Sequence, residues 1–147
     1  MNLSEEVTNV LVAEDDDDDY LIFCLAVDET EIATIVTRAE NGEVLMSTLK
    51  EKIPDILFLD IHMPCKDGKE CLLEIRSNKR YDHLPIIIYS SFKDIDTIEY
   101  CFRKGSNLYA IKPVEVKSLT KMLKAILLID WKNTLYYPPK SEFIVGL

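Results

Sequence analysis

Acidic, hydroxyl and ammonium side chains stand directly after four apolar runs of this sequence, and these side-chain types suit phosphoryl chemistry. They are Glu14 and Asp15 after residues 7–13, Asp60 after 56–59, Ser90 after 85–89 and Lys112 after 108–111. Three carboxylates brought together would repel one another, and Mg²⁺, a hard cation that prefers oxygen ligands, would relieve that repulsion. With the cation and the ammonium neutralising phosphoryl oxygens and the hydroxyl donating a hydrogen bond, the carboxylate of Asp60 could attack phosphorus.

The apolar runs are the expected strands that would bring these side chains together. Ile56–Leu59 is short, apolar at every position and flanked by Pro54 and Pro64, which indicates a strand buried on both faces. We expect strands at 7–13, 30–38, 56–59, 85–89 and 108–111, and helices at 18–27, 43–52, 67–77, 94–104 and 116 to about 131. This alternation predicts a doubly wound parallel α/β sheet, in which ligands bind beyond the carboxyl ends of the strands.

Size and composition are consistent with one cytoplasmic domain. The chain has 147 residues, of which 48% are hydrophobic, so it can build a full core. Its formal net charge of −9 argues against a nucleic-acid-binding surface. We see no apolar segment of about 20 residues that could span a membrane and no secretory signal at the amino terminus, so we expect no membrane association. The four cysteines fall in no metal-binding spacing and are expected to be free thiols.

Five segments of the sequence together resemble the receiver domain of bacterial two-component response regulators. They are VLVAEDD (10–16), RAENGEVL (38–45), PDILFLDIHMPCKDG (54–68), LPIIIYSS (84–91) and GSNLYAIKPV (105–114). The resemblance implies a flavodoxin-like, five-stranded parallel sheet with strand order 2-1-3-4-5. It also implies a single receiver domain over residues 1–147, with a core at about 7–130, an extended last helix and a C-terminal extension at 131–147.

The resemblance assigns a role to each acidic residue of the pattern. Asp60 matches the phosphoacceptor, and Glu14 and Asp15 match the acidic pair that holds Mg²⁺ together with Asp60. His62, two residues after the phosphoacceptor, would add its backbone carbonyl as a metal ligand. We interpret Asp17–Asp19 differently, as a solvated acidic turn that includes the helix cap.

The residues after the last two strands match the family's switch and phosphoryl-binding positions. Ser90 occupies the position of the Ser/Thr switch residue, and Lys112 that of the lysine that pairs with the phosphoryl group. Tyr109 matches the aromatic side chain that moves between outward and inward rotamers, although it could also be a half-buried strand residue. Pro113 predicts a cis Lys-Pro bond. Phe92, bulky and apolar, is expected to limit water access and to slow loss of the phosphoryl group.

The implied function is that of a single-domain response regulator rather than of an enzyme with its own substrate. A sensor histidine kinase would supply the phosphoryl group, and a downstream protein would read the phosphorylated state. The C-terminal tail is similar to that of stand-alone regulators that partner phytochrome-type kinases. We also consider a homodimer, formed through the face of helix four, strand five and helix five or through the C-terminal extension.

Two other functions are compatible with parts of the pattern. One is a Mg²⁺-dependent phosphatase with an aspartyl nucleophile. Such enzymes commonly carry a second acid two residues after the nucleophile, where this chain has His62. The other is a receiver-like interaction module that is never phosphorylated, against which the complete set of Asp15, Asp60 and Lys112 argues.

Overall fold

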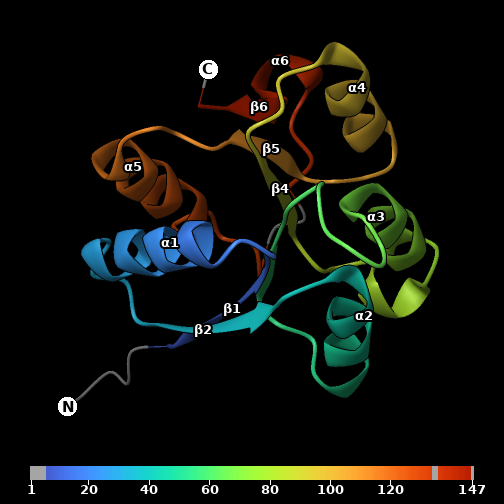
Figure 1. The fold of residues 1–147 in the computed structure, drawn as a ribbon, viewed down its shortest axis with the longest axis horizontal. Coiled ribbons are helices and arrows are strands. Elements are labelled where there is room, and N and C mark those ends of the chain that lie inside the picture. Colours follow the sequence, from blue (N-terminus) through green and yellow to red (C-terminus); the bar gives the residue numbers. More distant parts are fainter. Residues whose placement is uncertain (1–5, 134–135, 147) are drawn as a thin grey trace.

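One parallel sheet with strand order β2-β1-β3-β4-β5-β6 forms the centre of the molecule (Figure 1). The structure is a computed structural model that describes residues 6–133 and 136–146. The strands are β1 (Thr8–Ala13), β2 (Thr34–Ala39), β3 (Ile56–Leu59), β4 (Ile86–Ser90), β5 (Leu108–Ile111) and β6 (Ile144–Val145). The predicted α/β class and the order 2-1-3-4-5 are therefore confirmed, and β6 extends the sheet beyond the prediction.

Helices cover both faces of the sheet. They are α1 (Asp17–Glu29), α2 (Gly42–Glu51), α3 (Gly68–Arg76), α4 (Ile95–Arg103), α5 (Val116–Leu127) and α6 (Lys140–Phe143), with a 3-10 turn η1 at Lys79–Tyr81. In Figure 1, α1 and α5 lie together on one side of the sheet, and α2, α3 and α4 lie on the other. No helix within 6–133 and 136–146 is long and apolar enough to cross a membrane.

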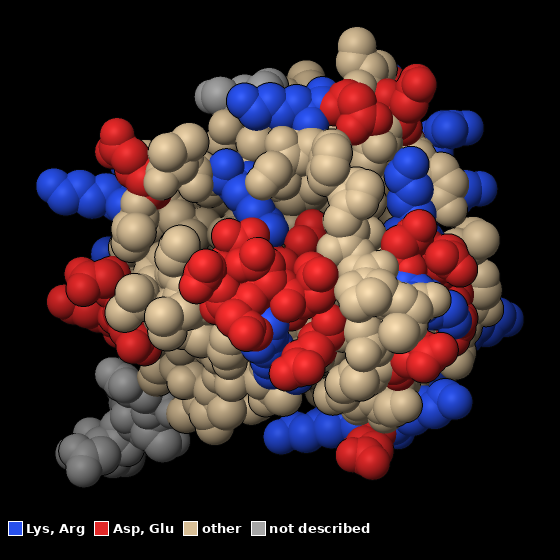
Figure 2. All heavy atoms as spheres, viewed as in Figure 1, with Lys and Arg blue, Asp and Glu red and all other residues tan. Residues whose placement is uncertain are grey.

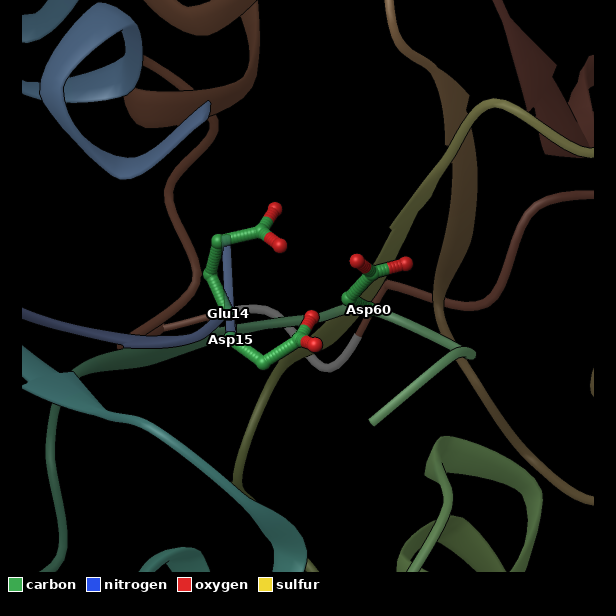
Figure 3. A group of neighbouring side chains, drawn as sticks. All are labelled: Glu14, Asp15 and Asp60. Carbon is green, nitrogen blue, oxygen red and sulfur yellow. The ribbon is translucent and has the colours of Figure 1, made fainter. Parts of the chain in front are cut away.

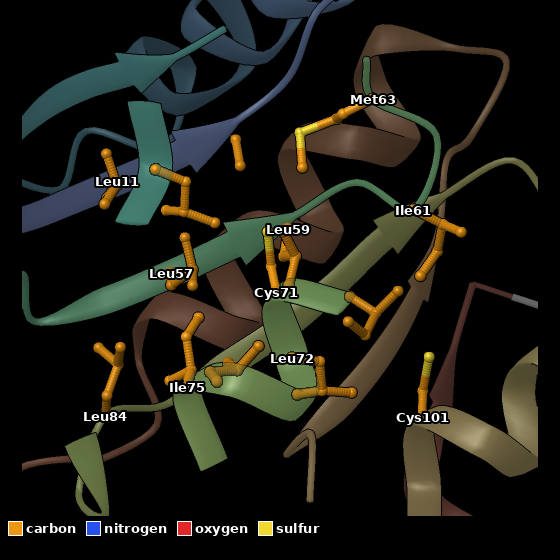
Figure 4. Close-up of a cluster of buried hydrophobic side chains, with 14 of the residues drawn as sticks. Leu11, Leu57, Leu59, Ile61, Met63, Cys71, Leu72, Ile75, Leu84 and Cys101 are labelled. Carbon is orange, nitrogen blue, oxygen red and sulfur yellow. The ribbon is translucent and has the colours of Figure 1, made fainter. Parts of the chain in front are cut away.

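Strand β3 shows why an uninterrupted apolar run is needed at the centre of this sheet. Leu57 and Leu59 point into the hydrophobic cluster on the side of α2 and α3, part of which Figure 4 shows. Ile56 and Phe58 point into the cluster on the side of α1 and α5. All four side chains are at most 1% exposed, because alternate residues of a strand face opposite layers.

Helices α1, α2 and α3, which begin near the carboxyl edge of the sheet, are fixed by side-chain caps. Asp16 caps α1 by accepting a hydrogen bond from the Asp19 amide, and Asn41 caps α2 in the same way. Asp67 and Glu70 form a reciprocal capping box at the start of α3. Each cap satisfies a backbone N–H that has no partner within its helix, and so sets where the helix and the preceding loop begin.

The last long helix is shorter than predicted. Helix α5 ends at Leu127, whereas the apolar stripe predicted an end near Trp131. The indole N–H of Trp131 instead turns back and donates to the carbonyl of Ile126, 3.0 Å away. The same carbonyl also accepts the amide of Ile129 at 3.2 Å, so both hydrogen bonds close the turn in which the chain leaves the helix.

The C-terminal segment, residues 136–146, packs on the domain. β6 pairs with β5 in register, with Ile144 opposite Tyr109. Phe143 is 1% exposed and contacts the ring of Phe102 edge-on, with the ring centroids 5.1 Å apart. Lys140 forms an ion pair with Glu99 of α4. The segment therefore covers the β5 edge, which the predicted fold left open.

Candidate functional site

Three carboxylates meet at the carboxyl edge of the sheet, as the sequence predicted. Glu14 and Asp15 leave the end of β1, and Asp60 leaves the end of β3 (Figure 3). One oxygen of each lies within 4.8 Å of the others. Glu14 and Asp60 are 1% and 7% exposed, whereas Asp15 is open to solvent. Oxygen ligands at this spacing, two of them buried, fit a hard divalent cation such as Mg²⁺.

Lys112, at the end of β5, binds two of these carboxylates and that of Asp19. Its ammonium donates to Glu14 Oε1 at 2.7 Å, to Asp19 Oδ2 at 2.9 Å and to Asp60 Oδ2 at 3.2 Å. Burial alone would lower the pKa of Lys112, but the charge of Asp60 and the hydrogen bonds to Glu14 and Asp19 outweigh it and raise the pKa. The ammonium is therefore fully charged at neutral pH.

For Glu14, burial is the largest influence on the pKa and favours the neutral form. Burial raises the pKa of the Glu14 carboxyl from its ordinary value of 4.5 to about 7, with a hydrogen bond from Lys112 lowering it and the charge of Asp60 raising it. The guanidinium of Arg38 donates to the backbone carbonyls of Glu14 and Asp15 rather than to the Glu14 carboxylate. The guanidinium thereby fixes the main chain at the end of β1.

The loop after β3 holds Asp60 by its backbone. The amide of Asp60 donates to the carbonyl of Ala13 at 3.1 Å, which ties the loop to β1. Gly68 donates to the carbonyl of Ile61 at 2.8 Å and packs directly on the same loop. A Cβ at position 68 would lie 2.1 Å from the carbonyl oxygen of Asp60, so only glycine fits there. The glycine of the sequence motif therefore has a steric role.

Ser90, Tyr109 and Phe92 form a second group, linked through the backbone of Phe92. Ser90 is fully buried, and its hydroxyl oxygen accepts a hydrogen bond from the Phe92 amide at 3.1 Å. The Tyr109 hydroxyl donates to the Phe92 carbonyl at 2.7 Å. Tyr109 is 0% exposed, so its ring lies inward, and burial raises its pKa to about 12.

His62, from the loop after β3, packs on Phe92 of this group. Their ring centroids are 4.1 Å apart, with both side chains exposed. The pair joins the loop after β3 to the loop after β4. The imidazole of His62 thus packs on the aromatic ring of a neighbouring loop.

Three features of the site differ from the predictions or were not predicted. The Lys112–Pro113 bond is trans, so the predicted cis bond is wrong; trans is the lower-energy form of an X-Pro bond. Asp19, interpreted as part of a solvated turn, reaches Lys112. Arg38 was not singled out at all. Its only sequence signal was its position at the end of the predicted second strand.

The site lies on an acidic face of the molecule. Figure 2 shows Asp and Glu side chains gathered at the centre of the view, near the end of β1 in Figure 1. An anionic phosphoryl donor would be repelled there unless positive charge compensates. Lys112 supplies one such charge, and a divalent cation among Glu14, Asp15 and Asp60 would supply two more.

Comparisons with known proteins agree with this geometry. The model of the response regulator receiver domain family matches residues 10–124. An uncharacterised 14.6 kDa protein of Leptolyngbya boryana is 33% identical over 118 residues, which cover 79% of this chain and 87% of that protein. The probable C4-dicarboxylate response regulator DctR of Bacillus subtilis is 36% identical over 91 residues, 62% of this chain but 39% of the relative.

A solved structure supports the same assignment. The response regulator RPA3017 in red light signaling of R. palustris superposes with a TM-score of 0.79 at 25% identity, covering 90% of this chain and 99% of that chain. This chain spans less than half the length of the first curated relatives that it matches. The family match itself covers most of the chain and includes every residue of the site described above. The chain therefore belongs to the response regulator receiver domain family.

Proposed function

We propose that Asp60 is the phosphoacceptor of a single-domain response regulator. The observation that carries this proposal is the position of Asp60, buried at a strand end, hydrogen-bonded to Lys112 and within 4.8 Å of the Glu14 and Asp15 carboxylates. A structural acid that caps a turn would not need two further carboxylates and an ammonium around it. Members of this family signal by phosphorylation, so the chemistry and the family membership agree.

The transfer is an in-line displacement. A carboxylate oxygen of Asp60 forms a bond to phosphorus, the bond from phosphorus to the histidine nitrogen of a sensor kinase breaks, and the imidazole keeps the electron pair. Glu14, Asp15, Asp60 and the backbone carbonyl of His62 would hold Mg²⁺, which neutralises phosphoryl oxygens when bound. Lys112 then holds the acyl phosphate by an ion pair.

Ser90 and Tyr109 are proposed to report the phosphorylated state. The Ser90 hydroxyl would leave the Phe92 amide to donate to the phosphoryl oxygen, which changes the loop that accepts the Tyr109 hydroxyl bond. Both residues hydrogen-bond to the backbone of Phe92, Ser90 at its amide and Tyr109 at its carbonyl, so a change at one can be transmitted to the other. The phosphoryl group would thus favour one of two existing arrangements of the face formed by α4, β5 and α5.

The output is proposed to pass through protein contacts, without nucleic acid or membrane. A sensor histidine kinase is the upstream partner, and the similarity to a red-light regulator favours the phytochrome type. The downstream protein stays unidentified. For a homodimer, the predicted face would include the C-terminal segment, because β6 pairs with the β5 edge and Phe143 packs on Phe102 of α4. We further propose that the chain is one receiver domain and that it acts in the cytoplasm.

Intact-mass measurement after incubation with Mg²⁺ and acetyl phosphate tests the proposal. We expect the addition of one phosphoryl group, abolished in Asp60→Asn and by removal of Mg²⁺. A matched control is Asp18→Asn, an exposed acid of α1, which should be phosphorylated like the wild type. The absence of any adduct would favour an interaction module that is never phosphorylated. Steady turnover of small phosphomonoesters would favour an aspartyl phosphatase.

A further inference from the structure

Lys112 uses all three of its ammonium donors on carboxylates, and one of the three acceptors has no role in the site as described so far. Glu14 and Asp60 belong to the three-carboxylate cluster, but Asp19 does not. The Lys112 side chain is 11% exposed and the Asp19 side chain 40%. Asp19 is therefore the most exposed of the three acceptors, whereas Glu14 and Asp60 are buried.

The carboxylate of Asp19 is held in place by the start of α1. The Asp19 amide donates to Asp16 Oδ1 at 2.8 Å, and the Asp16 amide donates to Glu14 Oε2 at 3.3 Å. The cap of α1 is thus tied to the same glutamate that binds Lys112. Because Asp19 lies in the first helical turn, its side chain comes from a rigid element rather than from a loop.

The demands on the other two acceptors change during the reaction. Asp60 loses its negative charge at the carboxylate when it becomes an acyl phosphate, and Glu14 is shared with the metal site. A lysine has a flexible four-carbon stem, so its ammonium needs a fixed partner to stay at one place. Asp19 belongs neither to the metal site nor to the phosphorylated residue, so it can keep its hydrogen bond to Lys112 throughout the reaction.

We infer that Asp19 is a positioning residue, which holds the ammonium of Lys112 beside Asp60 so that it can pair with the incoming phosphoryl group. This inference rests on the proposed function of Asp60. It assigns a role in the reaction to one member of the acidic run at the start of α1. The neighbouring Asp18 is exposed and its side chain forms no hydrogen bond or ion pair within residues 6–133 and 136–146, so the two residues form a matched pair.

The rate of phosphorylation by acetyl phosphate at saturating Mg²⁺ tests the inference. Asp19→Asn and Asp18→Asn remove the same charge from the same helical turn, so any general effect on an anionic donor is common to both. We expect Asp19→Asn to be about fivefold slower than Asp18→Asn, a size set by the partial exposure of the ion pair. Asp19→Glu should recover part of the rate. Equal rates, or a faster Asp19→Asn, would overturn the inference.

Two further measurements keep the result specific. In a Lys112→Gln background, Asp19→Asn should have no additional effect on the rate; a persistent fivefold loss would mean that Asp19 does not act through Lys112. In the unphosphorylated protein, the ¹H–¹⁵N signal of the Lys112 ammonium should broaden in Asp19→Asn and remain in Asp18→Asn. If the wild type accepts no phosphoryl group but shows this NMR difference, the proposed function fails while the contact between Asp19 and Lys112 stands.

Discussion

Replacement of Asp60 by asparagine should stabilise the metal-free protein at about pH 8. Asp60 lies within 4.8 Å of both the Glu14 and the Asp15 carboxylates, and 3.2 Å from the Lys112 ammonium. With an effective dielectric constant of about 20, each repulsion costs about 3.5 kcal/mol and the attraction returns about 5 kcal/mol. The net cost of the Asp60 charge is about 2 kcal/mol, or about 1–2 kcal/mol after screening of the exposed Asp15.

Thermal unfolding in the presence of a chelator measures this cost. Asp60→Asn should raise the melting temperature by roughly 3–8 °C, the shift expected for about 1–2 kcal/mol in a chain of this size. The Asn side chain retains an oxygen that can accept the Ile61 amide, so that contact need not be lost. Millimolar Mg²⁺ should stabilise the wild type and have a much smaller effect on Asp60→Asn, because binding to the native state adds stability.

The stability gained in Asp60→Asn should depend on pH through the ionisation of Glu14. Burial raises the pKa of Glu14 from 4.5 to about 7, so the protonated form is favoured in the native state. Its contribution to stability is complete below the unfolded value of 4.5 and is lost as the pH rises through about 7. The advantage of Asp60→Asn should therefore disappear at about pH 5, where Glu14 is protonated. An equal or lower melting temperature for metal-free Asp60→Asn at about pH 8, with Asp18→Asn unchanged, would refute the reasoning.

Three other outcomes follow from the packing around the site. Phe92→Ala should shorten the lifetime of the acyl phosphate by opening water access beside the switch loop; an unchanged decay rate would contradict a shielding role. Phe143→Ala should cost about 3–5 kcal/mol in urea unfolding, because the ring is 1% exposed; a loss below about 1 kcal/mol would mean that the C-terminal segment contributes little. Cys65, which is exposed, should react with a thiol-specific disulfide reagent, whereas Cys71 and Cys101, with pKa values raised by burial to about 12, should react only on unfolding.

Sequence patterns predicted the parts of the fold that depend on continuous burial. β3 is apolar at every position because both of its faces are covered. β4 and β5 are also buried along their whole length, although β4 ends on Ser90. β2 was less well predicted. The sequence suggested a strand from Thr30, but Thr30 ends α1, where its hydroxyl donates to the Val27 carbonyl. A threonine-rich stretch fits a strand and a helix end equally well, so only the three-dimensional contacts distinguish them.

The C-terminal segment could not be predicted, because its structure depends on a surface that exists only after folding. β6 has two residues, too few to show a period, and α6 has four. The partners of Phe143 are Phe102 and Tyr109, distant in sequence. Periodicity reports how an element faces the core, but it carries no signal for where a short element docks.

The sequence predicted which residues gather at the site, but it did not predict all the contacts among them. Strand ends identified Glu14, Asp15, Asp60, Ser90 and Lys112, since parallel strands place their carboxyl ends at one edge. In a run of five aspartates, however, nothing in the sequence says which one faces Lys112. That choice depends on where the cap at Asp16 starts α1, which places Asp19 in the first turn within reach of Lys112.

The pairing of β6 with β5 also bears on how two copies of this chain could meet. β6 is supplied by the same chain, so its effective concentration at the β5 edge is on the order of millimolar. A β6 strand from a second copy would make identical hydrogen bonds, but it must compete with the β6 strand of the same chain. At micromolar protein the intramolecular strand wins, and exchange between copies requires Phe143 to leave its pocket first. Exchange of β6 between two copies would therefore require protein concentrations on the order of millimolar.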